Sequence, residues 1–491
     1  SELCLAEGDW ASGEQALIRL ARHVIELPRQ AQIYRRLGEL YDTTLPNPER
    51  AELAYKEVLK REPEDEGTVA RLVQVYGRLG DQATAVQLQT DLLARAKTPD
   101  EKRQRTLALA LVEEQIAGDR KRAEATFEKA RKEWPHDSAV LRALAEFQQR
   151  HGETRATQML LDRATSDARR ALGTGRFEPG FFEVLATVAE LKNLGDAALV
   201  ARSTLAALHG EEVPVPAAGP IAGDPRLDEL LAPELVSPPL RALLRKSGAI
   251  LDAAYSVDLR AMRAAPLPVS AAAFNSYVQQ VAASFGIRGL EVFASPALGP
   301  VCLPISSAPP QLVFGQALLD SEDDAARYFL LIRSLKVLQG HAAALSRTAP
   351  VELWPVLAAF LSLFAPNWIP QGVDAKKLAD TQKRIQGAMT QRVDDDVPML
   401  ALEVIGAIGN RASLLGTALN QWGNRTALLS AGSLVASLRG VALANGLTAG
   451  PPKDGGERVK WIVRNPEARD LATFAVGEQY AESRSRLGLS R

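Results

Sequence analysis

Residues 69–93, VARLVQVYGRLGDQATAVQLQTDLL, show two short runs with helical periodicity on either side of a Gly-Asp pair. Each run has a stripe of positions at helical spacings that is expected to face the other run: Leu72, Val73 and Tyr76 in the first, and Ala85, Gln89 and Leu92 in the second. Gly80 is expected to end the first helix, and Asp81 to cap the second. The pattern predicts two antiparallel amphipathic helices that interlock through small and large residues.

Similar helix pairs are predicted along the first 210 or so residues. The candidate turn glycines are Gly80, Gly118, Gly152 and Gly195, separated by 38, 34 and 43 residues. A helix pair of this length cannot bury both of its faces alone, so successive pairs are expected to stack into one continuous core. We therefore expect a repeat architecture in this part of the chain.

The residues in register across these pairs resemble a tetratricopeptide repeat. In one unit the matching positions are Tyr34, Leu37, Gly38 and Tyr41 in the first helix, and Ala51, Tyr55, Val58 and Pro63 in the second. The insert TTLPNP lengthens the turn of that unit, and a strict array would repeat about every 34 residues. The resemblance implies an α-solenoid over residues 1–212, with a concave groove lined by the first helix of each pair.

Polar residues on the first helices are the candidate partner-binding positions of this groove. They are Arg35, Glu39, Gln74, Arg78, Arg142, Glu146 and Arg150. Their arginines are expected to clamp an acidic peptide or a C-terminal carboxylate through charge-assisted hydrogen bonds. The alternative is that interspersed charges are an ordinary solvated helix face.

Residues 213–239 contain seven prolines, which forbid a long helix. We interpret this stretch as a linker, followed at 240–491 by an α+β, mostly helical globular domain. Short β-rich runs are predicted at 289–294, 301–303 and 311–314. Helices are predicted at 240–264, 270–285, 321–346, 350–364, 374–392, 397–416, 424–445 and 467–487. The fold class expected for the whole chain is mainly α.

The layout of residues 312–347, a strand, an acidic turn and a long helix, resembles the surroundings of the zinc helix in gluzincin peptidases of the M48 type. That family carries HExxH there, with two imidazoles on one helix face and a glutamate that activates water. This sequence has Arg333, Ser334 and Val337 at the corresponding positions. The segment 424–434 is similar to the later helix that brings the third ligand. His341 is the only histidine of this half and is predicted to be a solvated helix-end residue, so the resemblance implies a domain without the metal site.

Composition narrows the function classes further. The net charge of −1 argues against bulk attraction to nucleic acid or an anionic membrane. No uncharged apolar run of about 18 residues is present, so no membrane span is predicted. Cys4 and Cys302 lie far apart and are expected to be buried and unpaired. We expect no cofactor, no metal and a cytoplasmic protein, whose chain starts as though within a longer array.

These observations predict a non-catalytic scaffold for protein–protein interaction. Its groove would hold a partner peptide or helix, and its second domain would serve for docking or assembly. One alternative is a hydrolase whose site the sequence does not reveal. Another is a structural protein that stacks end to end with itself.

Overall fold

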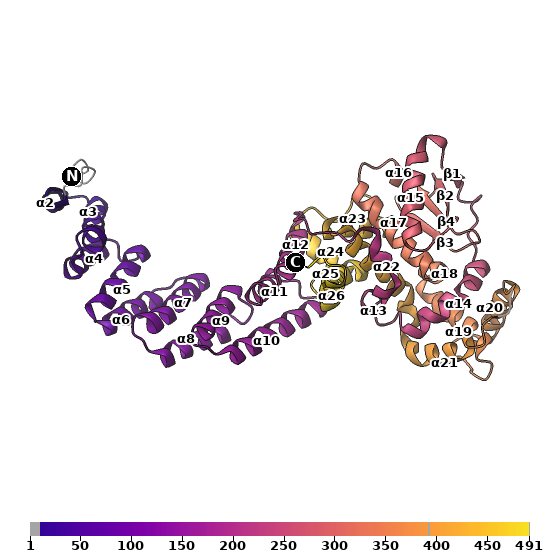
Figure 1. The fold of residues 1–491 in the computed structure, drawn as a ribbon, viewed down its shortest axis with the longest axis horizontal. Coiled ribbons are helices and arrows are strands. Elements are labelled where there is room, and N and C mark those ends of the chain that lie inside the picture. Colours follow the sequence, from indigo (N-terminus) through magenta and orange to yellow (C-terminus); the bar gives the residue numbers. More distant parts are fainter. Residues whose placement is uncertain (1–9, 391–392, 491) are drawn as a thin grey trace. The chain divides into compact units, whose positions relative to one another are not determined.

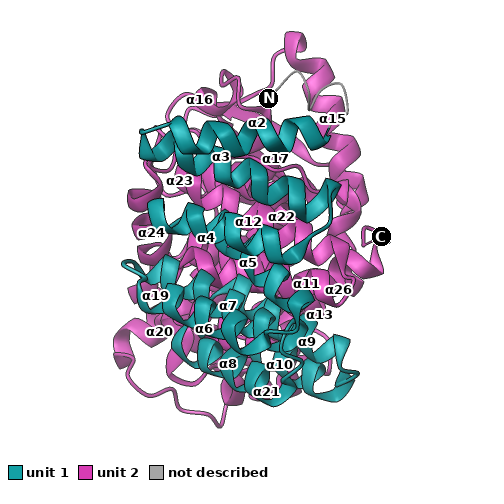
Figure 2. Ribbon diagram, turned by 90° about the vertical axis from the view of Figure 1, so that its left-hand side faces the viewer, with its two compact units in different colours: residues 1–163 teal, residues 164–491 magenta. Residues whose placement is uncertain are grey.

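The computed structural model describes residues 10–390 and 393–490, and it is mainly α-helical with a small four-stranded sheet (Figure 1). The chain divides into two compact units, residues 1–163 and residues 164–491 (Figure 2). Cys4 and the Gly8-Asp9 pair lie outside the described residues. The division differs from the predicted one, which placed the first domain at 1–212 and a linker at 213–239.

Unit 1 consists of helices joined by short turns. Their bounds are α2 (Trp10–His23), α3 (Leu27–Glu39), the π-helix η1 (Leu40–Thr44), α4 (Pro48–Arg61), α5 (Glu66–Leu79), α6 (Gln82–Ala94), α7 (Pro99–Gln115), α8 (Arg120–Glu133), α9 (Ser138–Arg150) and α10 (Thr154–Gly173), which continues into unit 2. From α3 to α9, each α-helix packs against the next one along the chain. The contacts are local in sequence throughout this unit.

The turns of unit 1 are stabilised as the sequence predicts. Gly80 adopts a left-handed φ of +76°, and the Asp81 carboxylate accepts the backbone N–H of Thr84 at 3.1 Å. Gly118 and Gly152 also have positive φ. All six apolar-face residues predicted in 69–93 are buried.

Small residues set the closest helix approaches in unit 1. The ring of Tyr55 is fully buried and lies against Gly38, where an added Cβ would come within 2.4 Å of the ring. The matching alanines and large residues of the second helices are buried as well, for example Ala123 and Phe127 at 0% exposure. The interlocking of small and large side chains predicted from the sequence is therefore confirmed at these positions.

After the end of α10, unit 2 continues with two helices, α11 (Pro179–Leu191) and α12 (Gly195–His209), which pack against each other. The predicted turn at Gly195 is displaced, because Asn193 takes the left-handed conformation with φ 57° and Gly195 is already the first residue of α12. Helix α12 also packs on helices near the C-terminus. Those contacts explain why residues 164–212 belong with unit 2.

The remaining elements of unit 2 are mostly helices around one small sheet. They are η2 (Gly219–Gly223), η3 (Pro225–Leu227), α13 (Asp228–Leu231), α14 (Pro238–Ala254), β1 (Ala265–Pro266), η4 (Val269–Ala271), α15 (Ala272–Ser284), β2 (Glu291–Ser295), β3 (Cys302–Ile305), β4 (Gln311–Gly315), α16 (Gln316–Leu319), α17 (Asp324–Gln339), α18 (Ala343–Arg347), α19 (Pro350–Phe364), α20 (Ala375–Gly387), α21 (Val397–Ile408), η5 (Gly409–Leu414), α22 (Leu415–Ala431), α23 (Leu434–Ala444), α24 (Gly455–Arg464), α25 (Pro466–Ala475) and α26 (Glu478–Arg486).

The sheet has the strand order β1-β2-β4-β3. Strands β2 and β4 are parallel, while β1 and β3 are antiparallel to their neighbours. Strands β2 to β4 occupy the three predicted β-rich runs, and β1 was not predicted. Strand β3 packs on α17 and α18, and α17 in turn packs extensively on α22. The core of unit 2 is centred on this helix pair.

The proline-rich segment is a packed part of unit 2 rather than a linker. We call residues 213–236 the strap. Its apolar side chains at Ala222, Leu231 and Val236 are completely buried. The backbone of the strap is bonded to more than one helix: Ala218 N–H donates to Leu429 O of α22 at 3.1 Å, and the Ser203 hydroxyl of α12 donates to Val213 O at 2.8 Å. Prolines prevent a long helix here, but tertiary contacts fix the extended chain.

Helices α21 and α22 with the intervening η5 form an apolar stretch, Val397–Ala431, which by length and composition alone could cross a membrane. The 3₁₀ segment and a positive φ of 52° at Gly409 interrupt it. Its second part, α22, lies in the core of unit 2, with Leu415 and Leu419 fully buried. The stretch therefore has the character of a broken core helix, although Met399 and Leu402 of α21 are exposed.

Candidate functional site

The seven candidate residues, which we call the first-helix face, lie on three helices of unit 1. Arg35 and Glu39 are on α3, Gln74 and Arg78 on α5, and Arg142, Glu146 and Arg150 on α9. Gln74, Arg78 and Arg150 are exposed, whereas Arg35, Glu39, Arg142 and Glu146 are half-buried. The helix assignment of all seven agrees with the sequence prediction, but the surroundings of the arginines do not match a set of open clamps.

Two of these arginines, Arg78 and Arg150, form ion pairs with the preceding helix pair. Arg78 pairs with Asp42, which follows α3, and Arg150 pairs with Glu114 of α7 at 2.7 Å. Both pairs join residues 36 positions apart: Arg78 of α5 contacts η1, which directly follows α3, and Arg150 of α9 contacts α7. These guanidinium groups are therefore engaged in joining consecutive helix pairs.

In a second kind of ion pair, the arginine contacts a carboxylate later in the chain instead of an earlier one. Arg35 pairs with Asp65 at 2.6 Å, and Arg103 pairs with Asp137 at 2.6 Å. Asp65 and Asp137 are the N-cap residues of α5 and α9, so each carboxylate caps one first helix and binds an arginine of the preceding one. Arg103 was not identified from the sequence; the signal was an arginine in a first helix, followed 30 or 34 residues later by an N-cap aspartate.

Residues aligned with the peptidase motif lie in closed contacts on α17. Arg333 pairs with Glu467 at 3.1 Å, and the Asn424 amide donates to that same carboxylate at 2.8 Å. The Ser334 hydroxyl donates to Cys302 O at 2.9 Å, and Val337 is buried. These positions are filled by hydrogen-bonded or apolar side chains that face neighbouring elements. Among the described residues, no group of three or more His, Cys, Asp or Glu side chains is arranged to hold a metal ion.

The same helix carries a fully buried lysine, Lys336. Its ammonium pairs with Asp228 of the strap, donates to Gln339 Oε1 at 2.7 Å and lies 4.8 Å from the centroid of the Trp422 ring. Burial lowers the pKa of Lys336, while the Asp228 carboxylate opposes that shift. The cluster fastens the strap to the core helix pair.

His341 is half-buried just beyond the end of α17, with a φ of 48°. Burial lowers the pKa of this histidine. The helix-end position agrees with the sequence prediction, but the predicted solvated surroundings were wrong, because the backbone at His341 packs closely on Gly248 of α14.

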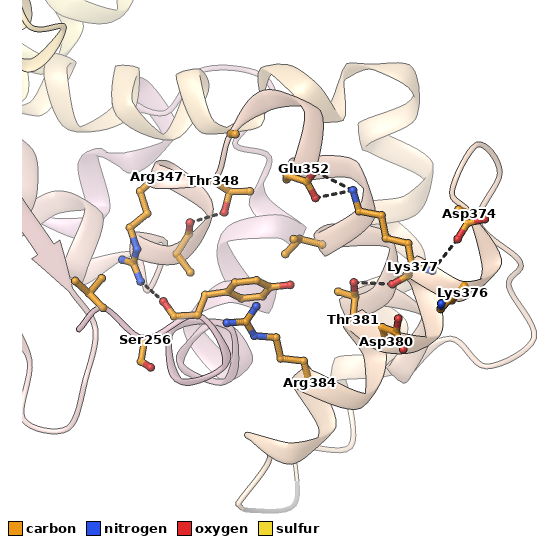
Figure 3. A pocket seen from close by; sticks show the side chains of 15 residues that line it. Ser256, Arg347, Thr348, Glu352, Asp374, Lys376, Lys377, Asp380, Thr381 and Arg384 are labelled. Atoms are coloured by element: carbon orange, nitrogen blue, oxygen red, sulfur yellow. Dashed lines mark hydrogen bonds and ion pairs between the residues drawn. The ribbon is translucent and has the colours of Figure 1, made fainter. Parts of the chain in front are cut away.

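A pocket of about 770 Å³ opens within unit 2 where the end of α14, the turn from α18 to α19, and α20 meet (Figure 3). The apolar part of its lining includes Tyr255, Val257 and Val356. Its size is in the range of small-molecule sites in proteins. The sequence analysis did not identify this pocket, because the three segments that form it are up to about 130 residues apart.

Two arginines of the pocket are bound to backbone carbonyls. Arg347 donates to Tyr255 O at 2.9 Å, and its Nη2 lies 3.8 Å from the buried Asp252 carboxylate. Arg384 donates from Nε to Ala254 O at 2.9 Å and stacks 4.4 Å from the centroid of the Tyr255 ring. Burial lowers the pKa of Arg347, although Asp252 opposes this.

The other charged groups of the pocket belong to the start of α20 and the first turn of α19. Lys377 pairs with Glu352 at 2.7 Å, and the Asp374 side chain caps α20 by accepting the Lys377 N–H at 2.9 Å (Figure 3). Lys376 and Asp380 are exposed. The arrangement can bind a charged small molecule, and the residues in it have no catalytic constellation of nucleophile and base.

Comparison with known proteins adds no family assignment. The chain matches no protein-family model, and a search of the curated proteins also finds no match.

Proposed function

We propose that residues 10–163 form a tetratricopeptide-type α-solenoid whose first-helix face binds a peptide or helix of a protein partner. The observation that carries the proposal is the chain of helix pairs, each packed on the next from α3 to α9. Stacked pairs of this kind present an extended surface far larger than a small-molecule site. We further propose that unit 2 is a docking or assembly module with a peptidase-like layout and no peptidase activity.

The ion pairs within unit 1 refine how this face would recognise a partner. Arg35, Arg78 and Arg150 contribute to joining the repeats, so they are poorly suited to act as clamps for a peptide carboxylate. Gln74 is exposed near the middle of the face, and Glu146 is half-buried on α9. We therefore place the partner contact over the polar side chains between the ion pairs.

Site-specific crosslinking tests the proposal without disturbing those ion pairs. A photoreactive amino acid replaces Gln74 in the full chain, and in a control chain it replaces Lys129, an exposed residue on the second helix α8. The expected result is a protein adduct that forms at position 74 and not at 129, and that the substitution Glu146→Lys weakens. Equal adducts at both positions, or none, would contradict a role of the first-helix face.

Fragments for such work should follow the observed units. Cutting at 212 would separate α12 from α24 and α25, on which it packs. The alternative of end-to-end self-stacking makes a different prediction, namely a molar mass by light scattering that rises with protein concentration. A hydrolase would instead show turnover that depends on residues of unit 2.

A further inference from the structure

We propose that the pocket between α14, α19 and α20 binds a small anionic molecule that carries a carboxylate or a phosphate group beside an apolar body. The proposal does not depend on the function assigned to unit 1. It rests on the shape of the pocket, on one guanidinium group without an ion-pair partner among the described residues and a second with only a long ion pair, and on the apolar side chains next to them.

Arg384 gives the strongest support for this anion site. Its Nε donates to a backbone carbonyl and its Cζ lies 4.4 Å from the centroid of the Tyr255 ring, so the guanidinium is held in place, and among the described residues its two terminal nitrogens have no hydrogen-bond partner. In the described part of the chain, no carboxylate lies within ion-pair distance of Arg384. A fixed guanidinium with two available N–H groups is the geometry that binds carboxylate and phosphate in a bidentate manner.

Arg347 gives further support, because it lines the pocket on the same side as Arg384 (Figure 3). Its nearest carboxylate is Asp252, at 3.8 Å, which is longer than a hydrogen bond. Burial raises the pKa of Asp252 to about 6, so the counter-charge behind Arg347 is weakened on the acidic side of neutrality. An anion in the pocket would supply the negative charge that Arg384 lacks, and it would add to the weak pairing of Arg347 with Asp252.

The carboxylates that line the pocket do not neutralise the positive charge of Arg384 and Arg347. Glu352 is neutralised by Lys377, and Asp374 is occupied as the cap of α20. Asp380 lies on the α20 side together with Lys376, away from Arg347 (Figure 3). The charged group of a ligand would therefore lie at the two arginines. Its apolar part would lie against the neighbouring side chains of Tyr255 and Val257.

Calorimetric titration of the full chain tests the proposal with three probes. Phenyl phosphate presents an aromatic ring and a phosphate, succinate presents carboxylates, and benzyl alcohol is the neutral control. We expect saturable binding of about one molecule of phenyl phosphate or succinate per chain and none of benzyl alcohol. The preferred anion identifies whether phosphate or carboxylate is the chemistry recognised.

The variant Arg384→Gln should weaken binding of the preferred anion about tenfold or more, since a charge-assisted hydrogen bond is lost. Arg288→Gln is the matched control, because Arg288 is exposed and lies outside the pocket; it should leave the affinity unchanged. Lys376→Gln, an exposed substitution on the side of the pocket away from Arg347, should weaken binding much less than Arg384→Gln (Figure 3). No saturable binding of either anion, equal binding of benzyl alcohol, or equal loss in Arg288→Gln would overturn the proposal.

Discussion

At the scale of single residues, the buried charges of this protein are held by partners from other elements, and Asp252 is the least satisfied of them. Lys336 has Asp228, and Arg484, which is completely buried, has Asp196 at 2.6 Å. Asp252 is 3% exposed, and neither carboxylate oxygen has a hydrogen-bond partner among the described residues. Desolvation of the charged form is the main reason that its pKa is raised from 3.8 to about 6.

Because the pKa of Asp252 is raised, the free energy of unfolding should depend on pH. Because the folded state binds the proton more tightly than the unfolded chain, the stabilisation from protonated Asp252 is complete below about pH 4 and is lost as the pH rises through about 6. In Asp252→Asn the side chain does not titrate. The free energy of unfolding of this variant, relative to the native protein, should therefore rise by up to about 3 kcal/mol between pH 4 and pH 7.

Urea denaturation at a series of pH values measures that difference. Removing the carboxylate beside Arg347 changes the free energy of unfolding by a similar amount at every pH. Only the change of the difference with pH therefore reports on the titration of Asp252. Glu403→Gln, at an exposed position on α21, is the control and should give a flat difference. A difference that is equally flat for Asp252→Asn would contradict the assignment.

At the scale of elements, the close packing of α3 on α4 in unit 1 depends on a glycine at the contact. Gly38 on α3 faces the buried ring of Tyr55 on α4, and α3 packs closely on α4. An added methyl group at Gly38 would overlap the ring, and the ring is too enclosed to move away freely. Helix propensity alone predicts the opposite, since alanine is the better helix former.

Gly38→Ala should therefore destabilise unit 1 by about 1–3 kcal/mol, the usual cost of overpacking a core. Amide hydrogen exchange of residues 27–61 is the direct measurement, and it should become faster in the variant. Gly406→Ala on α21 meets no atom within 4 Å and serves as the control, with unchanged or slightly greater stability. Unchanged exchange in Gly38→Ala would show that the two helices are not packed as described.

At the scale of the whole molecule, the strap decides how the chain is divided. Its five prolines, among the seven of residues 213–239, suggested a linker, yet it is bound to α12, α17, α22 and α26 of the same unit. Arg484 connects two of these regions, because it pairs with Asp196 of α12 and donates to Pro216 O of the strap at 2.7 Å. The strap and the segment 164–212 are thus parts of one core.

Hydrogen exchange should show the strap to be protected in the native protein, in contrast to a flexible linker. Arg484→Met leaves the Asp196 carboxylate buried without its partner, a change that typically costs about 3–5 kcal/mol. The variant should lower the stability of unit 2 and speed exchange at 213–219. Arg486→Met, two residues along α26 and exposed, should cost no more than about 0.5 kcal/mol. Rapid exchange of the strap in the native protein would favour the linker interpretation instead.

The sequence by itself determined the features that depend on neighbours in the chain. Helix periodicity, the cap at Asp81, the turn at Gly80 and the small residue at Gly38 all express local geometry, and the structure has them where they were predicted. The β-rich runs of the second half were predicted for the same reason. Their pairing and the added strand β1 were not, because strand pairing is made by segments distant in sequence.

Only the tertiary structure decided which partner each charged side chain has and which segments share a core. Arg78 and Asp42 are 36 residues apart, and Arg384 and Tyr255 are separated by more than a hundred residues. Periodicity cannot tell a solvated arginine from one that pairs with the next helix, because both occupy a polar face. It also cannot show that a proline-rich stretch is buried, since prolines restrict the backbone conformation but do not determine what packs against it.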